Sequence, residues 1–359
     1  MTGRSRNALK QSIQTLRGLA CIFLVAYHTI GSAPDRGLMM GDGTLLRHLA
    51  ESFQYLRMPL FAFVAGIVYT FRSVSPGQHV GGFLTGKARR LLIPLLVVGT
   101  LQYIVSGVSK GMTGSDLLGV VWLPVYPYEH FWFLQAIFMI FVLVAFLDSF
   151  GLLVQRAAVV VTLIVAAVIC AGDLVRLEYF SIHGALFLLP FFLLGLYFGR
   201  FGDPLARPGG VPIAWALVAV GVVVTQAGLL GYLDHPVSRE SPIGLLFGAA
   251  FCMLIMRTGW TNRYLGVIGN YSYGIYLFHM FGVAGLRMVL PRLGIHDPYV
   301  MFVIMLAGGI GLPILVELVA GRFTVTRMLL LGQKPLRPAR PAAGAAGEER
   351  LASERLAAR

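Results

Sequence analysis

Ten apolar stretches make up most of this chain of 359 residues, and each is long enough, or nearly so, to cross a bilayer. They cover approximately residues 13–32, 50–71, 91–108, 131–150, 157–172, 184–199, 211–230, 242–256, 272–290 and 299–320. Apolar runs of about 20 residues are typical of membrane-spanning helices. The sequence therefore predicts an all-α polytopic bundle of about ten transmembrane helices. The fifth, sixth and eighth stretches are short, so nine or eleven spans remain open.

The composition supports a membrane protein and its charges predict an orientation. Only 13% of the residues are charged, against about 25% in soluble domains, and mean hydropathy is +0.76. With ten spans and the N-terminus inside, 21 Lys and Arg fall on the cytoplasmic side and 8 on the other. This bias predicts that both termini are cytoplasmic. It also explains the net charge of +13 by contact with lipid headgroups, so we expect no nucleic-acid partner.

The chain divides into one long domain and a short tail. Residues 1–332 carry all the apolar stretches, and no sizeable soluble domain interrupts them. Residues 333–359 are rich in Ala, Arg, Pro and Glu, a composition that favours disorder. We therefore predict a membrane domain over 1–332 and a disordered cytoplasmic tail over 333–359.

Arg17 and His28 form the first candidate site. Both lie in the first apolar stretch, and a step of eleven positions along a helix corresponds to about 16 Å and a shared face. If this helix spans a bilayer, Arg17 lies near the headgroups and His28 near mid-depth. Because a titratable imidazole at that depth is costly, His28 is a candidate functional residue.

Further cations follow the second apolar stretch. Arg72 closes that stretch, and Lys87 and Arg90 lie three apart at the start of the third, which places them on one helix face. Together with Arg17 they are suited to a phosphorylated cytosolic ligand. The competing interpretation is that these residues only anchor the topology, and we favour it for Arg89.

Several other polar groups fall at membrane depth. His279 follows Tyr276 in the ninth stretch, and Glu317 lies near the inner end of the tenth, where it either pairs with a basic neighbour or orients a ligand-binding Arg. His130 precedes Trp132, which an interfacial aromatic belt would explain. No metal-ligand spacing stands out, so no metal is expected. These features fit a transporter with a proton-coupled His, or an enzyme that moves a group across the membrane.

Six segments carry motifs in a recognisable order along the chain. They are LRGLACIFLVAYH (16–28), MPLFAFVAGIVYTFR (58–72), KARRLLIP (87–94), HFWFL (130–134), FLLPFFLLGLYFG (187–199) and SYGIYLFH (272–279). The most specific pattern among them is the Arg-x10-His pair of the first helix, Arg17 and His28. In this order the six motifs resemble those of the acyltransferase-3 family of integral membrane acyltransferases.

The resemblance implies transfer of an acyl group, most simply acetyl, from cytosolic acyl-CoA to a hydroxyl of a surface or exported glycan, at the bacterial inner membrane. By position, His28 would be catalytic with Arg17 as its partner, and Lys87 and Arg90 would lie near the donor with Arg72. Residues assigned to the substrates are Trp132, Tyr276, His279 and Glu317. Acyl-CoA would be a substrate, with no permanently bound cofactor, and no extracytoplasmic hydrolase-like domain is fused.

The chain also departs from the family pattern. Lys87 replaces the first Arg of an Arg-x-x-Arg motif, Ala65 stands where Ser is common, and the usual Pro does not follow Glu317 two residues later. Lys lacks the bidentate phosphate geometry of Arg. The alternative function is a transporter or exporter of a glycan or lipid-linked sugar, and a third is a membrane assembly partner without activity.

Overall fold

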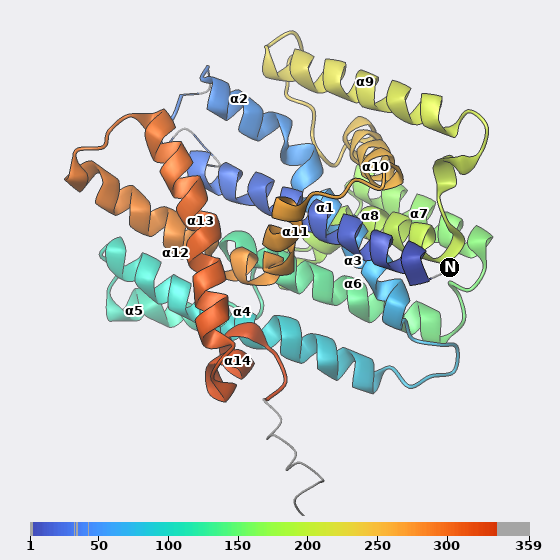
Figure 1. The fold of residues 1–359 in the computed structure, drawn as a ribbon, viewed down its shortest axis with the longest axis horizontal. Coiled ribbons are helices and arrows are strands. Elements are labelled where there is room, and N and C mark those ends of the chain that lie inside the picture. Colours follow the sequence, from blue (N-terminus) through green and yellow to red (C-terminus); the bar gives the residue numbers. More distant parts are fainter. Residues whose placement is uncertain (1–2, 32, 34, 42, 336–359) are drawn as a thin grey trace, which may run out of the picture.

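The computed structural model describes residues 3–31, 33, 35–41 and 43–335, and over these ranges it is built from helices without a β-strand. In chain order the longer helices are α1 (Gly3–Ile30), α2 (Leu45–Ser52), α3 (Gln54–Tyr69), α4 (Gly81–Ser109), α5 (Gly114–Leu117), α6 (Trp132–Ser149), α7 (Arg156–Ala171), α8 (Ile182–Phe201), α9 (Gly210–Leu229), α10 (Pro242–Arg257), α11 (Arg263–Asn270), α12 (Ser272–Val289), α13 (Pro298–Ala320) and α14 (Thr324–Leu331). Short 3-10 turns are η1 (Thr70–Arg72), η2 (Leu118–Trp122), η3 (Glu129–Phe131), η4 (Tyr179–Ser181), η5 (Pro204–Ala206) and η6 (Leu290–Leu293). The expected all-α bundle is confirmed (Figure 1).

Every predicted apolar stretch is helical, although not all the helices are equally long. Within the described ranges, seven helical segments are long and apolar enough to cross a membrane. They are Asn7–Ile30, Gly81–Ser109, Glu129–Ser149, Tyr179–Phe201, Gly210–Leu229, Ser272–Leu293 and Pro298–Ala320. The other three stretches form α3, α7 and α10, of 16 residues each. The protein is thus a multi-pass membrane protein.

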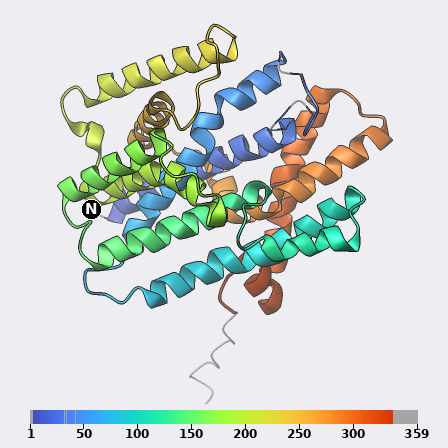
Figure 2. The same ribbon diagram turned by 180° about the vertical axis from the view of Figure 1, so that it is seen from behind.

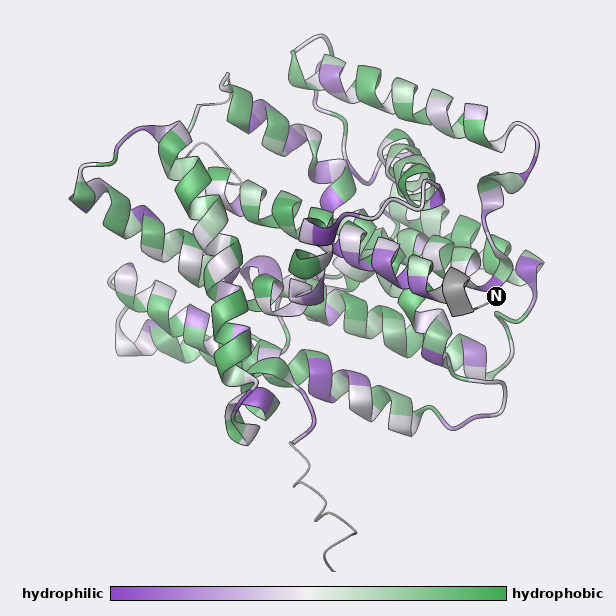
Figure 3. Cartoon of the chain, in the orientation of Figure 1, coloured by the Kyte–Doolittle hydropathy of each residue, from purple (hydrophilic) through white to green (hydrophobic). Residues whose placement is uncertain are grey.

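The helices at the edge of the bundle present apolar side chains outward, as a lipid-facing surface requires. Only 22% of the apolar window in α13 is buried within the protein, and only 17% in α9, whereas 61% is buried in α6 and in α8. Figure 3 shows α13 as largely hydrophobic along its length. α6 and α8 therefore form the core, and α9 and α13 lie at the periphery.

α1 passes through the middle of the bundle, with α9 and α4 at opposite edges in both views (Figures 1 and 2). It packs against α3, α11, α12 and α13. The contact with α11 depends on glycines, because a Cβ on Gly18 would lie 2.0 Å from the Leu265 carbonyl oxygen and one on Gly269 would lie 1.9 Å from that of Gln14. α1 and α11 thus approach backbone to backbone, as small residues allow in membrane bundles.

α3 and α8 form a second close crossing. A Cβ on Gly66 would lie 2.0 Å from the Phe192 carbonyl oxygen, and a Cβ on Gly195 would lie 1.9 Å from that of Phe63. Phe63 and Phe192 are themselves fully buried. The crossing therefore fixes α3, which carries several residues of the site, against the core of the bundle.

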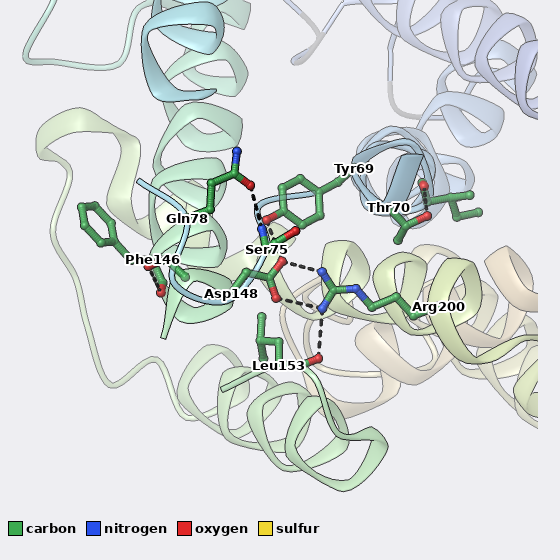
Figure 4. Close-up of polar contacts among 10 residues, drawn as sticks. Tyr69, Thr70, Ser75, Gln78, Phe146, Asp148, Leu153 and Arg200 are labelled. Atoms are coloured by element: carbon green, nitrogen blue, oxygen red, sulfur yellow. Dashed lines mark hydrogen bonds and ion pairs between the residues drawn. The ribbon is translucent and has the colours of Figure 1, made fainter. Parts of the chain in front are cut away.

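A buried ion pair joins α3, α6 and α8 near the end of the bundle at which α1 begins. We call this end the predicted cytoplasmic end, and the opposite one the predicted outer end. The Arg200 guanidinium donates to Asp148 Oδ1 at 2.8 Å and to the Leu153 carbonyl at 2.9 Å, and the Tyr69 hydroxyl donates to Asp148 Oδ2 at 2.7 Å (Figure 4). Asp148 is only 2% exposed, so its charge depends on these partners.

Two of the short helices that were not predicted contribute to the packing of the longer ones. α11 precedes α12 and ends at Asn270, and Ser272 and Gly274 in the first turn of α12 are buried. α14 follows α13 and packs against α4, where the backbone of Gly332 reaches that of Arg89 and Arg90. Most of the predicted tail, residues 336–359, lies outside the described residues.

Candidate functional site

Three histidines from distant parts of the chain meet at the predicted outer end. His28 belongs to the last turn of α1, His130 to η3 and His279 to α12. Their ring centroids are 4.6 Å apart for His130 and His279, 5.0 Å for His28 and His279, and 5.9 Å for His28 and His130. His130 is 3% exposed and His279 is fully buried. We call this group the histidine cluster.

The ring nitrogens of the cluster are only partly satisfied. Nδ1 of His279 lies 3.0 Å from the Ile275 carbonyl oxygen and 2.9 Å from that of Tyr276, which assigns a proton to this nitrogen. Its Nε2 and both ring nitrogens of His130 are buried without a hydrogen-bond partner among the described residues. Neutral imidazoles with a free nitrogen can accept a proton from a substrate hydroxyl.

Helix packing explains why these rings meet. α12 begins deep in the bundle and packs along α1 and α13, which carries His279 to the level of His28. The Tyr276 hydroxyl donates to the His130 carbonyl oxygen and so ties α12 to the start of α6. In the part of the chain that the structure describes, no group of three or more His, Cys, Asp or Glu is arranged to hold a metal ion.

A cavity of about 380 Å³ opens beside the histidine cluster. His28, His130, Trp132 and Tyr276 line it. Three of these, His28, Trp132 and Tyr276, were predicted as site residues. Its full lining is Leu24, Tyr27, His28, Arg36, Arg57, Met58, Glu129, His130, Trp132, Arg239 and Tyr276. His279 lies behind His28 and His130 and does not line it.

Arg57 lines this cavity but was not among the predicted site residues. It lies on α3, is 7% exposed, and its guanidinium carbon lies 3.2 Å from the centroid of the Tyr27 ring. An Arg inside an apolar stretch was the available signal. His130 lies two residues before the Trp-Phe-Leu block of 132–134, but nothing in the sequence placed it against His28.

A second polar group lies nearer the predicted cytoplasmic end. Glu317 on α13 accepts from the Gly274 backbone N–H at 3.1 Å and interacts electrostatically with Arg17 and Arg90. Arg90 stacks on the Tyr273 ring at 4.4 Å from its centroid. We call the cations Arg17, Lys87 and Arg90, together with the neighbouring Glu317 carboxylate, the cation group. Glu317 therefore accompanies the predicted donor residues and does not line the cavity with Trp132 and Tyr276.

The other predicted donor residues differ in their placement. Lys87 lies one turn before Arg90 on α4, with its ammonium 3.6 Å from the centroid of the Phe141 ring. Arg17 donates to Gln14 at 3.4 Å. Arg72, by contrast, is exposed at the end of η1, and no contact with the cation group is seen within the described ranges. The structure thus brings together three of the four predicted cations.

The depths expected for Arg17 and His28 need correction. The apolar helical segment runs from Asn7 to Ile30, so Arg17 lies near its middle and His28 in its last turn. The helix stops there because Gly31 has φ +109°, which turns the chain back over the site. The two side chains remain on one face, separated along the axis by about 16 Å.

A second cavity, of about 540 Å³, lies between the first half of α1 and α11 at the predicted cytoplasmic end. Most of its lining residues have polar side chains, and Gln14, the partner of Arg17, is among them, although the surface that they present to the cavity is mainly apolar. The lining residues are Lys10, Gln11, Gln14, Thr15, Thr261, Asn262, Arg263, Gly266, Val267 and Asn270. Cavities thus lie near both ends of α1, and His28 lines the one at the predicted outer end.

The fold defines a multi-pass membrane protein with a histidine cluster at one end of α1 and a group of cations nearer the other. The acyltransferase-3 family model, described as an acyltransferase domain, matches residues 10–318, and the chain belongs to this family. The match includes every predicted site residue from Arg17 to Glu317 and confirms the resemblance noted in the sequence. Comparison with curated proteins and with solved structures gave no match.

Proposed function

We propose that this membrane acyltransferase moves an acyl group, most simply acetyl, from cytosolic acyl-CoA to a hydroxyl of a surface or exported glycan at the bacterial inner membrane. The observation that carries the proposal is the position of His28, which lines a polar cavity at one end of α1 and shares a helix face with Arg17. This arrangement suits a donor that enters from one side and an acceptor that enters from the other.

The proposed chemistry requires one base. A ring nitrogen of His28 takes the proton of the acceptor hydroxyl while its oxygen attacks the thioester carbonyl carbon. The tetrahedral intermediate then collapses, the carbon–sulfur bond breaks, and the leaving CoA thiolate takes the proton back from the imidazolium. His28 is thereby returned to its neutral form. His is matched to this role because its usual pKa lies near neutral pH.

The neighbouring imidazoles support His28 by position. His279 contacts its ring at a centroid distance of 5.0 Å, and the buried Nδ1 of His279 is held by the α12 backbone. This anchoring fixes the surface against which the His28 ring rests. His130, whose ring nitrogens have no hydrogen-bond partner in the described part of the chain, provides a second acceptor at the cavity wall. Trp132 and Tyr276 would contact the acceptor sugar.

The donor would be held by the cation group. Arg17, Lys87 and Arg90 offer positive charge, and the Glu317 carboxylate orients two of them. The phosphates of CoA suit such a group because charge-assisted hydrogen bonds to phosphate are strong. The cavity between α1 and α11 would admit the nucleotide end of CoA. Arg72, which is exposed at the end of η1, would attract the CoA phosphates from the surface. No permanently bound cofactor is needed for this reaction.

The test is release of free CoA thiol by the purified protein in nanodiscs, given acetyl-CoA with and without a candidate glycan, followed by mass spectrometry of the glycan. Acceptor-dependent thiol release together with an acetylated product is expected. His28→Ala should abolish both, and His296→Ala, a histidine in the loop before α13, is the matched control. Transport of the glycan without thiol release would instead support the exporter.

A further inference from the structure

Arg57 is a buried cation with an unusual set of neighbours. Its Nη1 is buried and has no hydrogen-bond partner among the described residues. Tyr27 interacts with the guanidinium electrostatically and by a side-chain hydrogen bond, and its other electrostatic neighbour is a cation, Arg239. Burial of a charge costs free energy unless an opposite charge or a full set of hydrogen bonds offsets it. Stacking on the Tyr27 ring offsets part of the cost. A negatively charged ligand would offset the remaining free-energy cost of burying the Arg57 charge.

The surroundings of Arg57 are also positive. Arg36 and Arg239 line the same cavity, whereas Glu129 is the one carboxylate in its lining. Arg239 is partly engaged, because its Nε lies 3.5 Å from Glu240 and its guanidinium lies 4.9 Å from the centroid of the Phe187 ring. Three guanidinium groups against one carboxylate give the cavity an excess of positive charge. It thereby favours anions over neutral sugars.

The cavity adjoins the reacting atom of the proposed mechanism. Tyr27, whose ring carries Arg57, precedes His28 on α1, and Arg57 acts electrostatically on His28. A group held by Arg57 would thus lie close to the His28 imidazole, because Arg57 contacts the side chain of the residue that precedes His28. The cavity is about 380 Å³, a volume in the range of small-molecule sites.

We propose that the acceptor of this enzyme carries an anionic group, a carboxylate or a phosphate on the sugar, and that Arg57, with Arg36 and Arg239, binds it beside His28. The proposal deepens the proposed function, because it names the class of acceptor that the His28 cavity takes. The planar guanidinium of Arg57 matches a carboxylate or phosphate bidentately. The selected hydroxyl would be the one that reaches His28 while the anionic group is held.

The decisive measurement is binding of matched small sugars to purified protein in nanodiscs, without acyl-CoA, by calorimetric titration. Glucuronic acid is compared with its neutral methyl ester, and glucose 6-phosphate with glucose. A preference of about tenfold or more for the acid over its ester assigns a carboxylate. The same preference for glucose 6-phosphate alone assigns a phosphate. Equal binding of the charged and neutral member in both pairs overturns the proposal.

Variants separate the role of Arg57 from folding. Arg57→Ala should remove the preference for the anion while binding of the neutral ester changes little, and Arg57→Lys should retain part of it. Arg239→Gln, at a half-buried position, should reduce the preference and serves if Arg57→Ala does not fold. Arg292→Ala, an exposed cation at the predicted outer end, is the control and should change nothing. Equal loss of acid and ester in both cavity variants would contradict the proposal.

The proposed function is tested separately. Thiol release with neutral acceptors but no anion preference would retain the acyltransferase mechanism and reject the anionic acceptor. Anion binding without acceptor-dependent thiol release would retain the anion site and reject the acyltransferase mechanism.

Discussion

The imidazoles of His28 and His279 lie with their ring centroids 5.0 Å apart, although they come from the first long helix and from α12, near the other end of the chain. His279 is fully buried and its Nδ1 faces backbone carbonyl oxygens of its own helix. It is therefore held rigidly and supports the ring of His28, which borders the cavity. The relation suggests a positioning role for His279 and a chemical role for His28.

Replacement of the two histidines should separate these roles. His28→Ala is expected to lower the rate of acyl transfer by about 10²- to 10⁴-fold, the usual cost of losing a general base. His279→Gln should lower it less and should shift the pH–rate profile, because it changes the surroundings of the His28 ring. Acceptor-dependent thiol release over a range of pH measures both. Normal turnover by well-folded His28→Ala would remove His28 from the mechanism.

Arg90→Ala should raise the apparent KM for acyl-CoA by about tenfold to a hundredfold and leave the KM for the acceptor nearly unchanged. The reason is that a charge-assisted contact contributes roughly 1.5–3 kcal/mol. Arg207→Ala, an exposed cation at the predicted cytoplasmic end, is the matched control. Calorimetric titration with acyl-CoA checks the affinity directly, and equal affinities of wild type and Arg90→Ala would restrict Arg90 to a topological role.

Lys87→Arg should be tolerated, since it restores the residue common in the family and keeps the charge one turn before Arg90. The Lys87 ammonium rests against the Phe141 ring at 3.6 Å, and a guanidinium can stack on the same ring. The measurement is thiol release at saturating and at limiting acyl-CoA. A large rise in KM for this variant would show that the compact ammonium is required there.

Gly195→Val should prevent folding of the bundle. A Cβ at position 195 would lie 1.9 Å from the Phe63 carbonyl oxygen on α3, so α3 and α8 could not pack as closely as they do. Gly285→Val on α12 is the control, because a Cβ there meets nothing within 4 Å. Size-exclusion chromatography of the detergent-solubilised proteins reads out folding. A monodisperse Gly195→Val protein of normal activity would contradict this crossing.

Asp148→Ala should destabilise the protein by about 3–5 kcal/mol, the cost of leaving a buried charge such as Arg200 without its partner. Arg200→Ala is expected to cost a similar amount, and the double variant less than the sum of the two, because the residues form one pair. Thermal unfolding in detergent measures the three variants. Additive losses would show that the two side chains act independently.

The C-terminus should lie in the cytoplasm. The 21-to-8 division of Lys and Arg between the two sides is the physical basis of this orientation. A C-terminal fusion to a reporter active only outside the cytoplasm should give no signal, and a fusion to one active only inside should give a strong one. The opposite pattern would mean that the number of spans is odd or that the predicted orientation is inverted.

The sequence alone determined which segments form the long apolar helices and which side chains are costly to bury. Apolar runs of bilayer length leave few options other than helices, because lipid offers no partner to backbone groups. The same reasoning selected Arg17, His28, His279 and Glu317, since each lies in an apolar run. It also selected Lys87 with Arg90, because positions three apart on one helix share a face.

Only the tertiary structure decided which of these residues meet. The break between α11 and α12 and the glycine contact between α11 and α1 set the depth at which α12 begins, and so place His279 and Tyr276 against His28 and His130. Helix periodicity fixes the face of a side chain but not the partner helix or its axial offset. For that reason the sequence did not predict that Arg57 and His130 lie at the site, that Glu317 lies beside Arg17 and Arg90, or that Arg72 lies at the surface away from them.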